Sequence, residues 1–320
     1  MIHSVVQPCF FTPEMFKKTV LAMLLSAASS VFAVPLSSQH AVVIDEASGA
    51  VLLEKNAHEV VPIASLTKLM TAMVVLDAKL DMNELITIDE SDVDTLKFSS
   101  SRVPVGTVLS RGDLLELALM SSDNRAAHAL GRTYPGGSPA FLRAVREKLV
   151  ALDMRHTSIA EPTGLSPYNR STAADLVKMV SAASQYSEIS RLSTGTEDMI
   201  DMNGHTVHYR NTNRLVGRDG WDILLSKTGF TREAGRCLVM RFQAAGKHVI
   251  MVLLNAKEST ARLMDAENVQ RLVTGEPFLS AKAPSKAPTR VAAGKAKFSK
   301  AGFVLTKSKN DKGRKKRKTM

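Results

Sequence analysis

The strand-like segments of this chain lie at the two ends of its apolar body, and helical patterns fill the stretch between them. Two short runs, 39–45 and 50–56, flank the turn sequence DEASG and predict a hairpin. Three further strand-like runs follow at 222–230, 236–242 and 248–255. A parallel α/β sheet would alternate strand and helix along the whole chain. We therefore expect an α+β fold with about five strands, mainly antiparallel, drawn from both ends of the body.

Helical periodicity occupies the middle of the body and its end. The run SRGDLLELALM begins with Ser110 and has Asp113 three places later, which is the spacing of a capping box. Further helices are expected at 124–131, 139–152, 172–184 and 260–273. We expect an all-helical region packed on one side of the sheet, flanking helices, and a terminal helix that covers the sheet.

The segment 66–78 is apolar on nearly every side, which is typical of a helix buried in the middle of a domain. It contains Lys68, and Ser65 lies three residues earlier. Positions i and i+3 share a helix face, so this spacing places a hydroxyl beside an amine. Serine is also a common N-cap and lysine a common helix residue, so the pair alone does not establish catalysis. A lysine in a buried helix nevertheless suggests a nucleophile and its base.

Two other short motifs complete a set. SSDN at 121–124 follows an apolar helix, so Ser122 and Asn124 are expected on a turn between helices. KTG at 227–229 ends a strand-like run, and we expect Lys227 and Thr228 on a sheet edge beside the same cleft. The patterns S-x-x-K, S-D-N and K-T-G together are a signature of penicillin-binding proteins and class A β-lactamases.

With these three motifs in this order, the chain resembles the low-molecular-mass penicillin-binding proteins, the serine DD-peptidases of the bacterial cell wall. The segments IASLTKLMTAMVVLDA, LALMSSDNRAA, EPTGLS and KTGFTREAGRCLVMR are most similar to the periplasmic D-alanyl-D-alanine endopeptidase branch. The resemblance spans about 39–275. It implies a β-lactamase/transpeptidase-like fold, with the active site where the sheet meets the all-helical region.

The resemblance also implies roles for the catalytic residues. Ser65 would attack a D-alanyl carbonyl and become acylated, with Lys68 as its base. A base must be a neutral amine, and burial and the like charge of Lys227 would both lower the pKa of Lys68. Ser122 would relay a proton to the leaving amine, and Asn124 would hold Lys68 and the substrate in place.

Substrate binding is expected along the KTG strand. Lys227 and Thr228 would offer a positive charge and a hydroxyl, and the acyl donor would add to the strand edge. By analogy with the family, the backbone N–H groups of Ser65 and Phe230 would form the oxyanion hole. Gly229 is small, which is compatible with a cleft open on the leaving-group side.

Alternative functions remain at this stage. Glu161 begins a Glu-Pro sequence like that of the deacylating loop of class A β-lactamases, but Leu165 stands where those enzymes have Asn. Asp123 is interpreted as solvent-facing or turn-forming. A DD-carboxypeptidase of this family typically carries a second, all-β domain and an anchoring helix, and the residues after 274 are too few and too polar to build either. Together with the resemblance to the endopeptidase branch, these features favour a DD-endopeptidase; the resemblance implies peptidoglycan peptides as substrates and β-lactams as inhibitors.

Charge and targeting signals divide the chain into three parts. Residues 1–33 contain Lys17 and Lys18 before an apolar run that ends at Ala33, which predicts a cleaved signal peptide and a periplasmic protein. Residues 281–320 carry fourteen Lys and Arg against one Asp, so the net charge of this tail alone, +13, exceeds the net charge of the whole chain, +11. We expect the tail to be disordered and to contact an anionic wall or membrane surface rather than nucleic acid. The peptidase body is 34–280.

The residues usually found in metal and redox sites are sparse. Cys237 is the one cysteine left after removal of residues 1–33, and its apolar neighbours predict a buried filler rather than a nucleophile. His205 and His208 lack other ligand residues nearby. We therefore expect neither a metal nor a cofactor.

Overall fold

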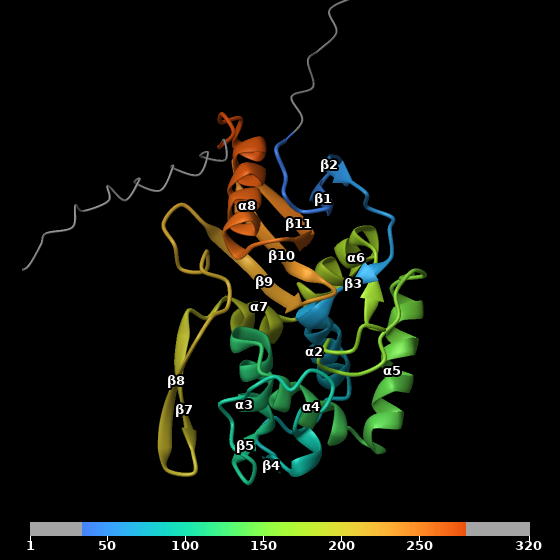
Figure 1. The fold of residues 1–320 in the computed structure, drawn as a ribbon, viewed down its shortest axis with the longest axis vertical. Coiled ribbons are helices and arrows are strands. Elements are labelled where there is room, and N and C mark those ends of the chain that lie inside the picture. Colours follow the sequence, from blue (N-terminus) through green and yellow to red (C-terminus); the bar gives the residue numbers. More distant parts are fainter. Residues whose placement is uncertain (1–33, 280–320) are drawn as a thin grey trace, which may run out of the picture. The chain divides into compact units, whose positions relative to one another are not determined.

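A five-stranded antiparallel sheet organises the computed structural model, which describes residues 34–279 (Figure 1). The strands run in the order β2-β1-β11-β10-β9, and every neighbouring pair is antiparallel. Their bounds are His40–Asp45 for β1, Val51–Lys55 for β2, Asp222–Thr231 for β9, Gly235–Ala244 for β10 and Lys247–Ala256 for β11. The expected α+β fold, with a sheet drawn from both ends of the body, is confirmed.

Apolar side chains cover both faces of this sheet. On one face, Leu238, Met240 and Phe242 of β10 share a buried cluster with Ala266 and Val269 of the terminal helix α8 (Ser259–Thr274). The opposite face joins the core of the helical region, because alternate strand residues point to opposite sides. Cys237 lies on that inner face, fully buried as expected, and burial raises the pKa of its thiol to about 11.

The helical region is built around α2 (Thr67–Asp77), nine of whose eleven residues are buried. The surrounding helices are α3 (Arg111–Glu116), α4 (Asn124–Arg132), α5 (Gly137–Ala151), α6 (Ala173–Ala183) and α7 (Ser187–Thr194). The predicted capping box at the start of α3 is present, with the Ser110 hydroxyl accepting from the Asp113 N–H at 3.0 Å. After α3 the chain continues as a π-helical turn, η3 (Leu117–Ser121).

Several smaller elements have no counterpart in the sequence prediction. They are α7, the short turn η2 (Glu90–Asp92), the paired strands β3 (Val61–Pro62) and β6 (Arg170–Ser171), the pair β4 (Leu85–Thr87) and β5 (Val108–Ser110), and the hairpin β7 (Glu197–Met202) and β8 (His205–Arg210). The hairpin strands are mostly polar and exposed, so no strand alternation marks them. The dipeptide Asn203-Gly204, with both φ angles positive, is nevertheless a hairpin-turn signal that could have located them.

The expected signal peptide, 1–33, and basic tail, 281–320, lie outside the described residues. Between residues 34 and 279, none of the helices combines the length and the apolar character needed to cross a bilayer.

Candidate active site

Ser65 lies in a 3₁₀ turn, η1 (Ala64–Leu66), that leads directly into α2. Its neighbour Ala64 has a φ of 48°, a left-handed conformation that is costly for a residue with a side chain. Two glycines allow other chain segments to press against this turn. A Cβ on Gly164 would come within 2.0 Å of the Ala64 carbonyl oxygen, and one on Gly229 within 3.2 Å of the Ser65 nitrogen. Close backbone packing therefore holds the turn in place.

Lys68 points from α2 back to Ser65 and is 1% exposed. Its Nζ donates to Ser65 Oγ at 3.0 Å, to Asn124 Oδ1 at 2.8 Å and to the Thr163 carbonyl oxygen at 2.7 Å. A neutral amine has two hydrogens and one lone pair. With both hydrogens directed to Asn124 and Thr163, the lone pair faces the Ser65 hydroxyl. This arrangement suits proton transfer from Ser65 to Lys68.

Burial lowers the pKa of Lys68 to about 8, while the carboxylates of Glu161, Asp123 and Asp94 act in the opposite direction. At that pKa roughly one Lys68 amine in ten is neutral at pH 7, far more than for an ordinary lysine. The pKa of Lys227 is also lowered well below its usual value, mainly by burial and then by the charge of Lys68. Burial is therefore the main cause of the lowered pKa of Lys68, as expected, and the like charge of the two lysines adds to the lowering of the pKa of Lys227.

The SSDN segment forms the turn between η3 and α4. Ser122 ends η3 in a left-handed conformation, with a φ of 62°, and its side chain lines the cleft. Asp123 is not solvent-facing as expected: it is buried and caps α4 by accepting from the Ala126 N–H at 3.0 Å. The other part of the expectation, that Asp123 helps to form the turn, is confirmed, because Asp123 is the N-cap of α4.

Asn124 opens α4 and is held by a residue that the sequence motifs do not contain. Its Nδ2 donates to Ser99 Oγ at 2.8 Å, which directs its Oδ1 toward Lys68. The orientation of the Asn124 amide is therefore fixed by Ser99 at its nitrogen and by Lys68 at its oxygen. No sequence signal pointed to Ser99, because its contact depends on the path of the loop before β5.

The KTG segment lies on β9, which is the edge strand of the sheet as expected. Lys227 points inward and is buried, while Thr228 and Phe230 face the cleft. Thr228 Oγ1 donates to Thr212 Oγ1 at 2.7 Å. The Phe230 ring is 49% exposed and stacks on the guanidinium of Arg236, 3.6 Å from the ring centre. Because β9 has a neighbour on one side only, its free edge can pair with an extended peptide.

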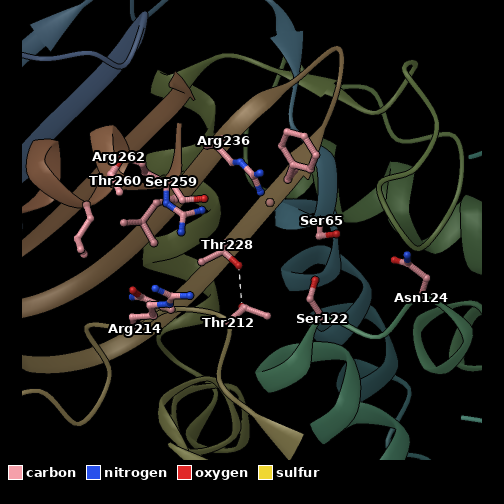
Figure 2. Close-up of a pocket in the computed structure, with 15 residues that line it drawn as sticks. Ser65, Ser122, Asn124, Thr212, Arg214, Thr228, Arg236, Ser259, Thr260 and Arg262 are labelled. Carbon is pink, nitrogen blue, oxygen red and sulfur yellow. Dashed lines mark hydrogen bonds between the residues drawn. The ribbon is translucent and has the colours of Figure 1, made fainter. Parts of the chain in front are cut away.

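One cleft, with a volume of about 430 Å³, joins these residues. Figure 2 shows its lining residues. Ser65, Ser122 and Asn124 lie toward the helical region, and Thr228 lies on the sheet side. Gly229 and Phe230, which belong to the same strand as Thr228, also line the cleft. The cleft continues past Thr228 to residues of β10 and α8; its remaining lining residues are Thr212, Asn213, Arg214, Arg236, Leu238, Ser259, Thr260, Arg262 and Leu263. Six of the eight predicted site residues thus line one cleft. Lys68 does not line it, but its Nζ contacts Ser65 Oγ at 3.0 Å. Lys227 is buried and does not line the cleft.

The carboxylate of Glu161 is engaged within its own loop. Its carboxylate accepts five hydrogen bonds from its own loop, from the N–H and hydroxyl of Thr163, the N–H groups of Gly164 and Ser166, and Asn169 Nδ2. These bonds fix the loop that offers the Thr163 carbonyl oxygen to Lys68. The role of Glu161 in this structure is therefore to shape the loop 161–169, which argues against the β-lactamase alternative.

Comparisons with known proteins agree with this geometry. Residues 27–258 match the family model of D-alanyl-D-alanine carboxypeptidase, peptidase family S11. A D-alanyl-D-alanine endopeptidase of Pseudomonas aeruginosa is 45% identical over 80% of this chain and 87% of its own length. An Escherichia coli protein of the same name is 43% identical over 81% of this chain and 83% of its own length.

Solved structures show the same fold. The DD-transpeptidase of Streptomyces K15 superposes with a TM-score of 0.69 at 25% identity, covering 74% of this chain and 97% of that one. Penicillin-binding protein D2 of Listeria monocytogenes, solved in its cefotaxime-bound form, has a TM-score of 0.64 at 30% identity and covers the same shares of the two chains.

Proposed function

The chain belongs to the D-alanyl-D-alanine carboxypeptidase family and is a serine D-Ala-D-Ala peptidase, and from this premise we propose that it is a DD-endopeptidase that cuts peptidoglycan cross-links. The observation that carries the chemistry is the buried Lys68 amine, held by Asn124 and Thr163 so that it faces Ser65 Oγ. The preference for cross-links over terminal D-Ala is supported by the endopeptidase names of the two relatives.

Acylation follows from the placement of these groups. Lys68 takes the proton of the Ser65 hydroxyl while Oγ forms a bond to the D-alanyl carbonyl carbon. The N–H groups of Ser65 and Phe230 stabilise the oxyanion of the tetrahedral intermediate. As the carbon–nitrogen bond breaks, the leaving amine receives a proton by way of Ser122. The product is an ester on Ser65, and the released amine belongs to the neighbouring wall peptide.

Hydrolysis of the ester regenerates the enzyme. Water adds to the ester carbonyl, the bond to Ser65 Oγ breaks, and Oγ regains a proton as the carboxylate product leaves. Lys68 is the group placed to move these protons. β-Lactams would acylate Ser65 by the same first step, with ring opening in place of amine release. Glu161 is occupied by its own loop, so we expect the β-lactam ester to be long-lived.

The decisive experiment compares two substrates with the mature 34–320 protein. Purified cross-linked wall-peptide dimers and uncross-linked pentapeptide monomers are incubated separately, and the products are identified by mass spectrometry. We expect conversion of dimers to be faster than loss of terminal D-Ala from monomers. The opposite order would identify a carboxypeptidase. Ser65→Ala should abolish both reactions, which excludes a contaminating hydrolase.

The same proposal includes a location and a role for the tail. Export by the signal sequence in 1–33 would place the enzyme in the periplasm, where the cross-links are. The strongly basic segment 281–320 would bind anionic wall or membrane surfaces and keep the enzyme near its substrate.

A further inference from the structure

One ion pair joins two chain segments that belong to opposite sides of the active-site cleft. Lys97 lies in the loop 93–107, which precedes β5 in the helical region, and its Nζ contacts the carboxylate of Glu233. Glu233 lies in the turn 232–234 between β9 and β10, on the sheet side. Among residues 34–279 no backbone hydrogen bond joins this loop to this turn. The hydrogen-bonded link between them is therefore made by side chains.

The ion pair completes a closed ring of contacts beside the nucleophile. The members of the ring, in order, are Lys97, Ser99, Asn124, Lys68, Ser65, Gly229 and Glu233. Hydrogen bonds of 2.8 to 3.0 Å form the three links between Ser99 and Ser65. A Cβ on Gly229 would lie 3.2 Å from the Ser65 nitrogen, so these two backbones are packed together. The backbones of the loop and of β9 supply the remaining links, and the ring borders the space next to Ser65.

The leaving half and the acyl half of a substrate extend in opposite directions from Ser65. Ser122, placed to give a proton to the leaving amine, lies on the side of Thr212 and Thr228 (Figure 2). The N–H of Thr212 also donates to the chain two positions before Ser122, at 3.1 Å. A peptide that adds to the free edge of β9 therefore has its leaving half near Thr228 and its acyl half toward the turn 232–234. The acyl half thus passes through the ring.

We propose that Lys97 and Glu233 form a strap across the acyl side of the cleft, and that this strap must open before a wall cross-link can bind. The proposal rests on the proposed endopeptidase function. The bond cut in a cross-link lies inside a network, because the acyl half is attached to one glycan strand and the leaving half to another. Neither half has a free end, and a chain without a free end cannot be threaded through a closed ring. It must be laid into the cleft from the side while the ion pair is broken.

Opening the strap requires only rotation of two partly exposed side chains, which is fast and costs little. The loop itself is held independently of the ion pair. The carboxylate of Asp94 accepts from the N–H groups of Leu96, Lys97 and Ser99 at 2.7 to 3.1 Å. The contact of Ser99 with Asn124 therefore persists when the strap opens, and the base stays oriented. A β-lactam or a short free peptide has free ends and needs no opening, so the strap acts on attached substrates alone.

A covalent lock tests the proposal in the mature 34–320 chain. Lys97→Cys and Glu233→Cys are combined and bridged with a short bismaleimide; the natural Cys237 is fully buried and stays unreacted. The control is the same double variant with both new cysteines blocked by N-ethylmaleimide. We expect the locked enzyme to be labelled by fluorescent penicillin at the rate of the control, but to open the cross-links of intact sacculi at least about tenfold more slowly.

Two results of the lock experiment would overturn the strap. One is equal opening of sacculus cross-links by locked and blocked enzyme. The other is an equal loss of penicillin labelling, which would mean that the lock distorts the site rather than bars passage. Failure of the proposed function looks different, because it appears without any lock: the unmodified enzyme would trim pentapeptide monomers faster than it opens dimers.

A pair of variants with the natural net charge tests the strap without a cross-linker. Lys97→Gln with Glu233→Gln removes the attraction, and Lys97→Glu with Glu233→Lys restores it with the charges exchanged. At low salt the glutamine variant should open sacculus cross-links up to about fivefold faster than the natural chain, the range for an exposed ion pair, and the exchanged variant should match the natural chain. At about 1 M salt the three rates should converge. A glutamine variant no faster than the natural chain, or an exchanged variant as fast as the glutamine variant, would contradict the proposal.

Discussion

The central feature at the scale of single residues is a lysine that the fold keeps from being fully charged. Water is excluded around Lys68, and this desolvation outweighs the nearby carboxylates, so the pKa falls to about 8. An ordinary lysine, with a pKa near 10.4, would be neutral in about one molecule in a thousand or fewer at pH 7. Burial therefore raises the fraction of active base by orders of magnitude. In the neutral state Asn124 and Thr163 accept from Nζ while the Ser65 hydroxyl donates to its lone pair, and in the charged state all three oxygens can accept, so the side chain need not move.

This pKa predicts the pH dependence of acylation. Raising the pH removes the proton from Lys68 and increases the amount of base, so the rate of Ser65 acylation by penicillin should rise with pH and level off above pH about 8. Stopped-flow or quenched labelling between pH 6 and 9 measures it. Lys68→Ala should remove the rise and slow acylation roughly 10²- to 10⁴-fold, the usual cost of losing a general base. A flat profile for the unmodified enzyme would assign the proton to another group.

At the scale of elements, the nucleophile depends on three segments that meet at one turn. The turn η1 is contacted by Gly229 of β9 on one side and by Gly164 of the loop 161–169 on the other. Thr71 of α2 donates to the Pro162 carbonyl oxygen at 2.7 Å, which ties the loop to the same helix that carries Lys68. The loop thus positions both the nucleophile and, through Thr163, the base.

Substitution of Gly164 by alanine should show this dependence. The new Cβ would lie 2.0 Å from the Ala64 carbonyl oxygen, so η1 must move, and small displacements of a nucleophile cost about 10²-fold in rate. Gly106→Ala is the control, because Gly106 has a similar φ of +83° against +88° but nothing within 4 Å of the added Cβ.

Both variants carry the strain of a left-handed alanine, about 1 kcal/mol, and only one carries the clash. We expect penicillin labelling of Ser65 to fall sharply in Gly164→Ala and to stay near the unmodified rate in Gly106→Ala. Thermal denaturation reports whether each protein is folded. Equal labelling rates in the two folded variants would contradict the positioning role of the loop.

At the scale of the whole molecule, the sequence predicted the elements that have a long, regular pattern of apolar residues and missed those that do not. The buried helix α2 and the apolar strands β10 and β11 have many apolar residues in regular order, and their positions were predicted closely. The polar hairpin β7–β8 has no such order, because tertiary packing of a few residues such as Tyr209 determines it.

In the active site, too, the sequence predicted some features and missed others. Each of the three motifs is contiguous and could be recognised, whereas the contacts that orient them join distant positions. Thr163 is 95 positions from Lys68, and Ser99 is 25 positions from Asn124. Neither contact depends on a distinctive side chain, since Thr163 acts through its backbone carbonyl. The far end of the cleft likewise gathers Arg214, Arg236 and Arg262 from a loop, β10 and α8, and only the folded chain brings them together.

Charge is the whole-molecule property that separates the tail from the peptidase body. The fourteen Lys and Arg of 281–320 exceed the net charge of +11, so the remainder of the chain is slightly acidic. A basic segment attached to an acidic body should bind anionic surfaces through the segment alone. Deletion of 281–320 should therefore leave penicillin labelling of Ser65 unchanged but reduce co-sedimentation with purified peptidoglycan sacculi or anionic vesicles.

Salt and a matched variant identify the cause. At an ionic strength near 1 M the screening length falls to about 3 Å, so full-length and shortened proteins should then sediment equally. A full-length variant in which every lysine and arginine of 281–320 is changed to glutamine keeps the length of the tail and should behave like the deletion. If that variant is retained as well as the natural chain at low salt, the tail acts through something other than its charge. If deletion changes nothing at low salt, the peptidase body itself holds the enzyme on the wall.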